Sequence, residues 1–202
     1  MRQLVAPIKD QQMLVEILRE LHDGFRYGVR NYTLFQVGKA TLLRVSDVVS
    51  LKKRDVYEQN GNIKRNAYTV DKKTHKPNTL YLKPVRQDLK DYWKWLEAHP
   101  DMMNSEWLFP SSVNPSEHLA QHSFYRVMQT VGKRLQLNYL GTHTMRKTGA
   151  YMVYEQSGHN IGLVMNLLNH SDAGVTLRYL GLDQQTKEQY LDRVDFGGLR
   201  RW

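Results

Sequence analysis

A single change of pattern constrains the fold more than any other feature of the sequence. Helical periodicity dominates the chain, but residues 55–82 contain short β-rich runs separated by turn signals. Val56 and Tyr57 precede an Asn60-Gly61 turn, and residues 63–70 and 79–82 follow it. Alternating runs around such turns are typical of antiparallel hairpins. We therefore expect an α+β fold, mainly helical, with a small three-stranded antiparallel sheet.

The remaining chain shows apolar residues at helical spacing, which predicts amphipathic helices packed around a core. The expected helices cover residues 10–21, 32–39, 85–97, 119–135, 142–156, 161–168, a short stretch ending near 179, and 184–194. Thr142 and Ser171 are predicted N-caps, and Asn169 is predicted to end a helix in the left-handed conformation. Residues 1–9 are expected to be a flexible lead-in. No internal repeat or linker divides the chain, so residues 1–202 are predicted to form one domain.

Charge and cysteine content narrow the function classes. The chain has 29 Lys and Arg against 20 Asp and Glu, and no cysteine. The excess of positive charge favours a polyanion such as nucleic acid as partner. The absence of cysteine excludes disulfides, thiolate zinc sites and cysteine nucleophiles. No signal peptide and no apolar run of roughly 20 residues is evident, so we expect a cytoplasmic protein without a membrane partner.

The stretch from residue 141 to 179 collects the side chains with the clearest chemical meaning. It contains His143, Arg146, His170 and Tyr179. Guanidinium, imidazole and phenol groups suit a phosphodiester better than a metal ion. A phenol has a reference pKa of about 10, so attack on phosphorus requires a nearby base or strong positive charge.

Two upstream segments add to this set. Arg44 and Asp47 stand at i and i+3, so on a helix the carboxylate is expected to orient the guanidinium. The connection at residues 71–77 carries Lys72, Lys73 and Lys76 at a hairpin tip, where they reach either solvent or a phosphate backbone.

The order of these motifs resembles the catalytic domain of the tyrosine recombinase, or phage integrase, family. The resemblance spans about residues 10–182. It rests on Arg44 with Asp47, the lysine hairpin, His143-Thr144-Met145-Arg146, and Leu168-Asn169-His170 followed nine residues later by Tyr179. Four positions depart from the family pattern. Leu42 and Asn169 replace glycines, Asp47 replaces glutamate, and Lys147 replaces histidine.

The resemblance implies site-specific DNA recombination through a covalent 3′-phosphotyrosyl intermediate, without metal, ATP or other cofactor. Arg44, Arg146 and His170 would hold the non-bridging oxygens, and Tyr179 would be the nucleophile. His143 would take its proton, and Lys73 would protonate the departing 5′ oxygen. Lys72, Lys76, Arg126 and Lys147 are candidate DNA contacts.

The resemblance also implies partners. The substrate would be double-stranded DNA with a specific recombination site. The protein would be a homotetramer on synapsed DNA and a monomer when free of DNA. Residues 184–202 would either dock on a neighbouring subunit or form an ordinary closing helix. The N-terminal core-binding domain usual in the family is not expected here, which leaves a compact recombinase and an excised catalytic domain as alternatives. The target site, and the choice among integration, excision, inversion and resolution, are open.

Two other functions are compatible with parts of this residue set. A type IB topoisomerase-like relaxing enzyme would share the tyrosine and arginine chemistry, and a non-catalytic DNA-binding module would share the fold. His118 and His122 stand at i and i+4, a spacing that can bind zinc, but no third ligand is evident.

Overall fold

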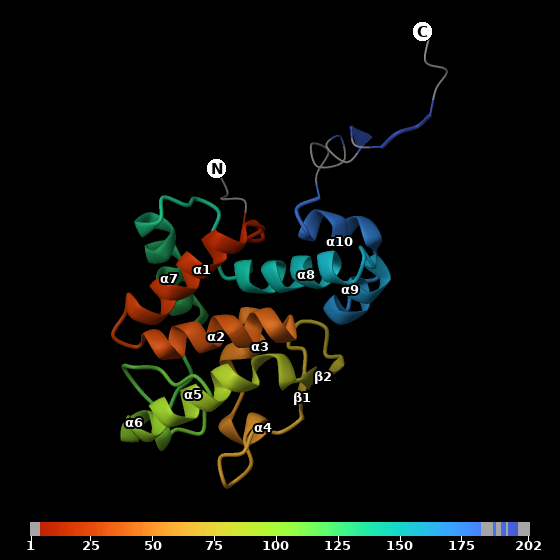
Figure 1. Cartoon of the computed structure of the whole chain (residues 1–202). Helices are drawn as coiled ribbons and strands as arrows, with labels where there is room; N and C mark the ends of the chain where they lie inside the picture. Colours follow the sequence, from red (N-terminus) through yellow and green to blue (C-terminus); the bar gives the residue numbers. More distant parts are fainter. Residues whose placement is uncertain (1–4, 183–187, 189–190, 193, 198–202) are drawn as a thin grey trace.

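Helices form most of the computed structural model, which describes residues 5–182, 188, 191–192 and 194–197 (Figure 1). The chain order of the elements is α1 (Gln11–Asp23), α2 (Gly28–Thr41), α3 (Val45–Val49), α4 (Lys53–Val56), β1 (Asn66–Val70), β2 (Pro77–Tyr81), the 3₁₀ helix η1 (Lys83–Val85), α5 (Arg86–Glu97), α6 (Pro100–Met103), α7 (Gln121–Arg134), α8 (Thr144–Gln156), α9 (Ile161–Leu168) and α10 (Ala173–Tyr179). This arrangement confirms the expected α+β class. None of the helices in the described part of the chain is long and apolar enough to cross a membrane.

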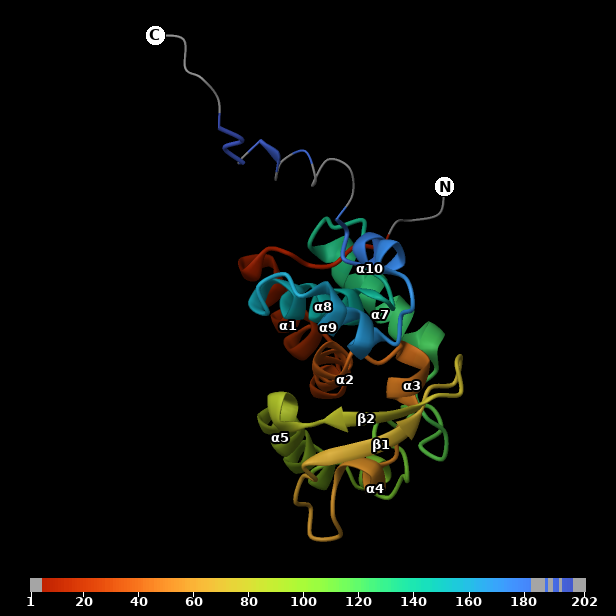
Figure 2. The same ribbon diagram turned by 90° about the vertical axis from the view of Figure 1, so that its right-hand side faces the viewer.

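The sheet has two strands within the described residues, so the prediction of three was wrong. β1 and β2 pair antiparallel with Asn66 opposite Tyr81 and Val70 opposite Pro77 (Figure 2). The expected first strand is instead the end of α4, a helix whose Asp55 carboxylate accepts a hydrogen bond from the Lys52 backbone at 2.8 Å. Tyr57 forms only an isolated bridge with Ile63. A capped helical turn therefore takes up residues that alternation alone assigned to a strand.

Helix α2 runs through the centre of the fold and packs against α1, α5 and α8. Figure 1 shows α8 on one side of α2 and α5 on the other. Most buried apolar residues belong to one main core around α2, which includes Leu34, Phe35, Leu89 and Phe124. A second cluster of buried residues lies under α9 and α10. Its members are Leu42, Ala150, Val164, Leu168, Leu180 and Leu182.

Two glycines allow α2 and α8 to approach closely. A Cβ atom added at Gly149 would clash with the Lys39 carbonyl oxygen and with a methyl group of Leu42. A Cβ atom at Gly38 would clash with the Met145 side chain. The crossing therefore brings the end of α2 directly against the first half of α8. Arg44 lies three residues after α2, and Arg146 lies in the first turn of α8.

Candidate active site

Arg44 lies just after α2, at the N-cap of α3, with extended backbone angles. The chain reaches it through Leu42, whose φ of 55° is in the left-handed region. The tyrosine recombinase family, which the sequence resembles, usually has glycine at this position. The positive φ explains that preference, because glycine adopts it without steric cost. Because Arg44 is outside the helix, its side chain does not follow the i, i+3 geometry expected from sequence. It forms an ion pair with Asp71 of the hairpin instead of with Asp47.

Asp47 has a different role from the predicted one. Its side chain is buried, and Oδ1 accepts the backbone N–H of Lys72 at 3.2 Å. Its other carboxylate oxygen, Oδ2, is buried without a hydrogen-bond partner among the described residues. Asp47 therefore holds the hairpin backbone next to Arg44 rather than the guanidinium itself.

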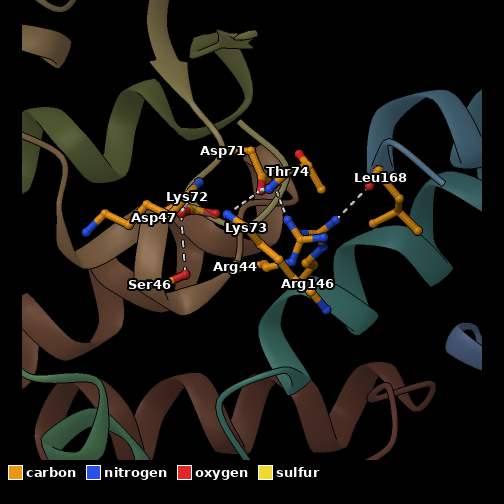
Figure 3. Close-up of polar contacts among 9 residues, drawn as sticks. All are labelled: Arg44, Ser46, Asp47, Asp71, Lys72, Lys73, Thr74, Arg146 and Leu168. Atoms are coloured by element: carbon orange, nitrogen blue, oxygen red, sulfur yellow. Dashed lines mark hydrogen bonds and ion pairs between the residues drawn. The ribbon is translucent and has the colours of Figure 1, made fainter. Parts of the chain in front are cut away.

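Arg146 projects from the first turns of α8 and is only 4 % exposed. Its Nη2 donates to the Leu168 carbonyl oxygen at 2.9 Å, while its buried Nε has no hydrogen-bond partner among the described residues. Figure 3 shows the side chains of Arg44 and Arg146 next to each other, between Asp71 and Leu168. Desolvation lowers the pKa of Arg146, and the charge of Arg44 lowers it further. Two largely buried cations that lie next to each other create a strong preference for an anion between them.

His143 occupies the N-cap position of α8, so the prediction that Thr142 caps this helix was wrong. The turn is closed instead by Thr144, whose hydroxyl accepts the Gly141 N–H at 2.8 Å. Desolvation lowers the pKa of His143, and the nearby charges of Arg146, Lys147, Arg44 and Lys73 act in the same direction. These effects keep the imidazole in its neutral form, which is the form able to accept a proton.

The turn between α9 and α10 positions His170. Asn169 ends α9 with a φ of 56°, which confirms the predicted left-handed stop. Asp172, not the predicted Ser171, caps α10 by accepting the Val175 N–H. The Nδ1 atom of His170 lies 3.1 Å from the Thr176 hydroxyl. Desolvation lowers the pKa of His170, and Arg146 and Arg44 lower it further.

Tyr179 is the last residue of α10 and lies against this group. Its ring packs edge-on against the His170 ring, with centroids 5.5 Å apart. The ring centroid is 6.0 Å from the Arg146 guanidinium carbon and 5.1 Å from the Lys147 ammonium. The hydroxyl is buried and has no hydrogen-bond partner among the described residues. Burial raises the pKa of Tyr179 to about 12, although Arg146 and Arg44 act to lower it.

The family model described as the phage integrase family matches residues 9–186. The chain belongs to the phage integrase family. It is 32 % identical to a probable integrase/recombinase, YoeC, of Bacillus subtilis over 184 residues, which are 91 % of this chain and 93 % of that relative. It is 31 % identical to the tyrosine recombinase XerD of Bradyrhizobium diazoefficiens over 161 residues, covering 75 % of this chain and 48 % of XerD.

Solved structures share the fold. The XerA recombinase superposes with a TM-score of 0.66 at 20 % identity, over 97 % of this chain and 67 % of XerA. The XerH recombinase bound to a palindromic difH substrate gives a TM-score of 0.64 at 22 % identity, over 94 % of this chain and 53 % of XerH. The chain thus spans about half the length of XerH and XerD.

Within the phage integrase family the chain is a tyrosine recombinase, an enzyme of site-specific DNA recombination. Neither the type IB topoisomerase-like enzyme nor the non-catalytic DNA-binding module is favoured by the family match and the relatives.

The hairpin lysines lie at the edge of the arginine pair. Lys72, Lys73 and Lys76 are exposed, and the charge of Lys73 contributes to the lowered pKa of His143. Among the other candidate DNA contacts, Arg126 is exposed on α7. The Lys147 ammonium is engaged inside the protein, because it donates to the Val5 carbonyl oxygen at 2.8 Å.

Two other places with functional residue types do not compete with this site. His118 interacts through Nδ1 with the Leu119 carbonyl oxygen, and no three potential ligands gather around a metal position within the described residues. A pocket of about 410 Å³ between α1, α2 and α5 is lined by three carboxylates, those of Asp23, Asp88 and Asp91, against one guanidinium, that of Arg19. Its carboxylates would repel a phosphate.

Proposed function

We propose that the chain cleaves and rejoins double-stranded DNA at a specific recombination site, with Tyr179 as the nucleophile. The observation that carries this proposal is that Arg44 and Arg146, about a hundred residues apart in sequence, lie next to each other and close to Tyr179, whose buried hydroxyl has no hydrogen-bond partner among the described residues. A buried polar atom without a partner is costly, so such an atom in a charged pocket is expected to meet a ligand.

The phosphate would take the donors that the protein leaves unused. Nε of Arg146 is buried without a partner among the described residues, and the Arg44 side chain is 18 % exposed beside its ion pair. Guanidinium groups bind phosphate oxygens through directed hydrogen bonds and stabilise the extra negative charge of the transition state.

His170 would add a donor when a phosphate is present. The Thr176 hydroxyl donates to the Asp172 carbonyl oxygen at 3.1 Å, so it accepts from Nδ1 of His170. The second ring nitrogen, Nε2, then donates to a phosphate oxygen only in the protonated ring. The negative charge of the phosphate favours that protonation and offsets the two arginines that oppose it.

The cleavage step is a transesterification. Tyr179 Oη forms a bond to phosphorus while the bond from phosphorus to the 5′ oxygen breaks. The phenol proton passes to His143, whose lowered pKa keeps it neutral near pH 7. Lys73 gives a proton to the 5′ oxygen, and attack by another 5′ hydroxyl reverses the step. Because the pKa of Tyr179 is about 12, the phenol stays protonated until the phosphate and base are in place.

The assembly is also a proposal. We expect a homotetramer on two synapsed sites, with Lys72, Lys76 and Arg126 on the DNA backbone and a smaller contribution from Lys147. Residues 184–202, the candidate subunit-docking segment, lie largely outside the described residues. The DNA partner is supported by two structural neighbours, since XerH was solved bound to its difH substrate and lambda integrase as a dimer bound to a core site.

Covalent capture tests this proposal and identifies the target site in the same experiment. The protein is incubated with a duplex library that has a randomised core and nicks near each candidate cleavage position, and DNA that stays attached after denaturation is sequenced. We expect wild type to enrich one site class and to yield an adduct on the peptide containing Tyr179.

The Tyr179→Phe variant should lose at least about 10³-fold of this attachment, since the nucleophile is removed. Tyr125→Phe, on the exposed face of α7, is the matched control and should react like wild type. Equal attachment by Tyr179→Phe, or an adduct on another residue, would refute the assignment.

A further inference from the structure

Asp71 is a buried carboxylate at the start of the hairpin tip. Its side chain is 4 % exposed, and burying a charge is costly unless that charge is paired and hydrogen-bonded. Asp71 has both kinds of partner. One oxygen, Oδ2, pairs with Nη1 of Arg44, and the other, Oδ1, accepts the backbone N–H groups of Lys73 and Thr74 at 2.9 and 2.8 Å.

The two oxygens therefore serve two different parts of the candidate active site. Arg44 comes from the α2–α3 junction, whereas Lys73 and Thr74 belong to the connection between β1 and β2. The main chain of Asp71 strengthens the turn, because its N–H donates to the Lys76 carbonyl oxygen and its carbonyl oxygen accepts from the His75 N–H. Figure 3 shows Asp71 between the hairpin backbone and the Arg44 side chain.

Electrostatics agrees with this geometry. Burial raises the pKa of the Asp71 carboxyl, but the hydrogen bonds from Thr74 and Lys73 and the charge of Arg44 together outweigh it and leave the pKa below its ordinary value. The carboxylate is therefore charged when it holds both partners. With Asp47 bonded to the Lys72 N–H, three successive backbone amides of the tip are fixed by buried carboxylates, while the Lys73 side chain stays exposed.

We infer that Asp71 is a positioning residue that ties the hairpin carrying Lys73 to the phosphate-binding Arg44, so that both cations address the same phosphodiester. This inference rests on the proposed function, in which Arg44 holds a non-bridging oxygen and Lys73 protonates the 5′ oxygen. Asp71 acts through these two residues and does not itself touch the DNA.

The two halves of this role can be separated by substitution. Asp71→Asn keeps an oxygen that accepts from the tip amides but removes the charge that pairs with Arg44. Asp71→Ala removes both. The alanine variant should therefore displace Lys73 and Arg44 together, and the asparagine variant should mainly loosen Arg44.

The test compares two leaving groups at the cleavage position in single-turnover reactions on the captured site. One substrate has the ordinary 5′ oxygen, and the other has a bridging 5′ sulfur, which leaves as a thiolate and needs no proton. A positioned general acid typically contributes about 10²–10⁴-fold. We expect Asp71→Ala to cleave the oxygen substrate at least about 10²-fold more slowly than wild type and to recover at least about 10-fold with sulfur.

The controls define each contribution. Lys73→Ala should show the same recovery with sulfur, whereas Arg44→Ala should be slow on both substrates. Asp71→Asn should be slower than wild type by the same factor on both. Asp88 lies away from the site, and its carboxylate accepts a hydrogen bond from the Tyr32 hydroxyl at 2.7 Å. Asp88→Asn should therefore behave like wild type. A partly unfolded preparation lowers both rates equally and leaves their ratio unchanged.

The outcomes distinguish this inference from the proposed function. If Asp71→Ala cleaves the oxygen substrate like wild type, or loses the same factor on both substrates, the role given to Asp71 is overturned while the tyrosine mechanism stands. If wild type forms no adduct at Tyr179, the proposed function fails and the inference fails with it.

Discussion

Arg44 with the lysine hairpin, and Tyr179, the proposed nucleophile, are held by very different parts of the molecule. Arg44 and the hairpin rest on the main core, where α2 is packed from several sides, and they are joined by a buried ion pair. Tyr179 lies at the end of the seven-residue helix α10, which rests on the small second cluster. We therefore expect the proposed phosphate-binding residues to be held rigidly and the proposed nucleophile to adjust at lower cost, because regions with few buried contacts open more readily.

Removing the Arg44 side chain should have the largest effect on stability, because it disrupts the well-packed region that holds the hairpin. Arg44→Ala leaves the Asp71 carboxylate buried without its cation, and breaking such a pair typically costs about 3–5 kcal/mol. The hydrogen bonds from Lys73 and Thr74 remain, so we expect about 3 kcal/mol of lost unfolding free energy in urea titrations. The double variant Arg44→Ala/Asp71→Ala should regain part of it, and equal losses in the single and double variants would contradict the pairing.

Hydrogen exchange measures the difference between the two regions directly. Amides of α9 and α10 should exchange through openings that cost at least about 2 kcal/mol less than openings in α2. Leu34→Ala in the main core should lower global stability by about 3 kcal/mol, whereas Leu168→Ala should mainly speed exchange in α9 and α10. Equal protection of both regions would remove the basis for calling one rigid and the other adjustable.

Alkaline pH should report the buried hydroxyl of Tyr179. Its pKa is about 12 in the folded protein, against a reference of about 10 in the unfolded chain. Between these values the unfolded chain has lost a proton that the folded protein keeps. The free energy of unfolding is therefore unaffected by this proton below pH about 10. It falls by about 1.4 kcal/mol per pH unit from there toward pH 12.

The matched variant isolates this contribution from the other tyrosines. Tyr179→Phe should be as stable as wild type near pH 7, or more stable by about 1 kcal/mol, since it removes a buried hydroxyl that has no hydrogen-bond partner within the described part of the chain. Its stability should fall less steeply than that of wild type above pH 10. Parallel curves for the two proteins would show that the hydroxyl is not buried in solution.

The smallest expected effect concerns how the adjustable part positions His170. Thr176→Val removes the hydroxyl that lies 3.1 Å from Nδ1 of His170. Loss of a hydrogen bond typically costs about 1 kcal/mol, which corresponds to roughly 5-fold in cleavage rate. Single-turnover cleavage should show this loss with Thr176→Val, and Thr176→Ser should retain the wild-type rate. A loss with serine as large as that with valine would point to packing.

Local rules predicted much of the fold and failed where the backbone left regular structure. Helical periodicity located the main helices, and the asparagine before His170 was predicted correctly at a positive φ. The i, i+3 rule assigned the wrong partner to Arg44, because that residue lies at an N-cap rather than within a helix. Its partner, Asp71, comes from the hairpin, and only the folded hairpin reveals that contact. The only sequence signal was an acidic residue at the start of a lysine-rich turn.

Burial at the site could not be predicted from the sequence either. The sequence indicates a phenol near cations, but the pKa of Tyr179 depends on the apolar second cluster and the arginines together. The roles of the six candidate residues remain predictions, and the family, the fold and the class of reaction are confirmed.

The close crossing of α2 and α8 has a consequence for how this enzyme can change over time. The two helices approach closely at Gly38 and Gly149, where an added Cβ atom would clash with the Met145 side chain and with the Lys39 carbonyl oxygen, respectively. We expect a larger residue at either position to leave every candidate catalytic group chemically intact and to shift Arg146 relative to Arg44. A descendant protein that lost either glycine would therefore retain all the candidate catalytic residues in its sequence. It would no longer hold them in the same relative positions.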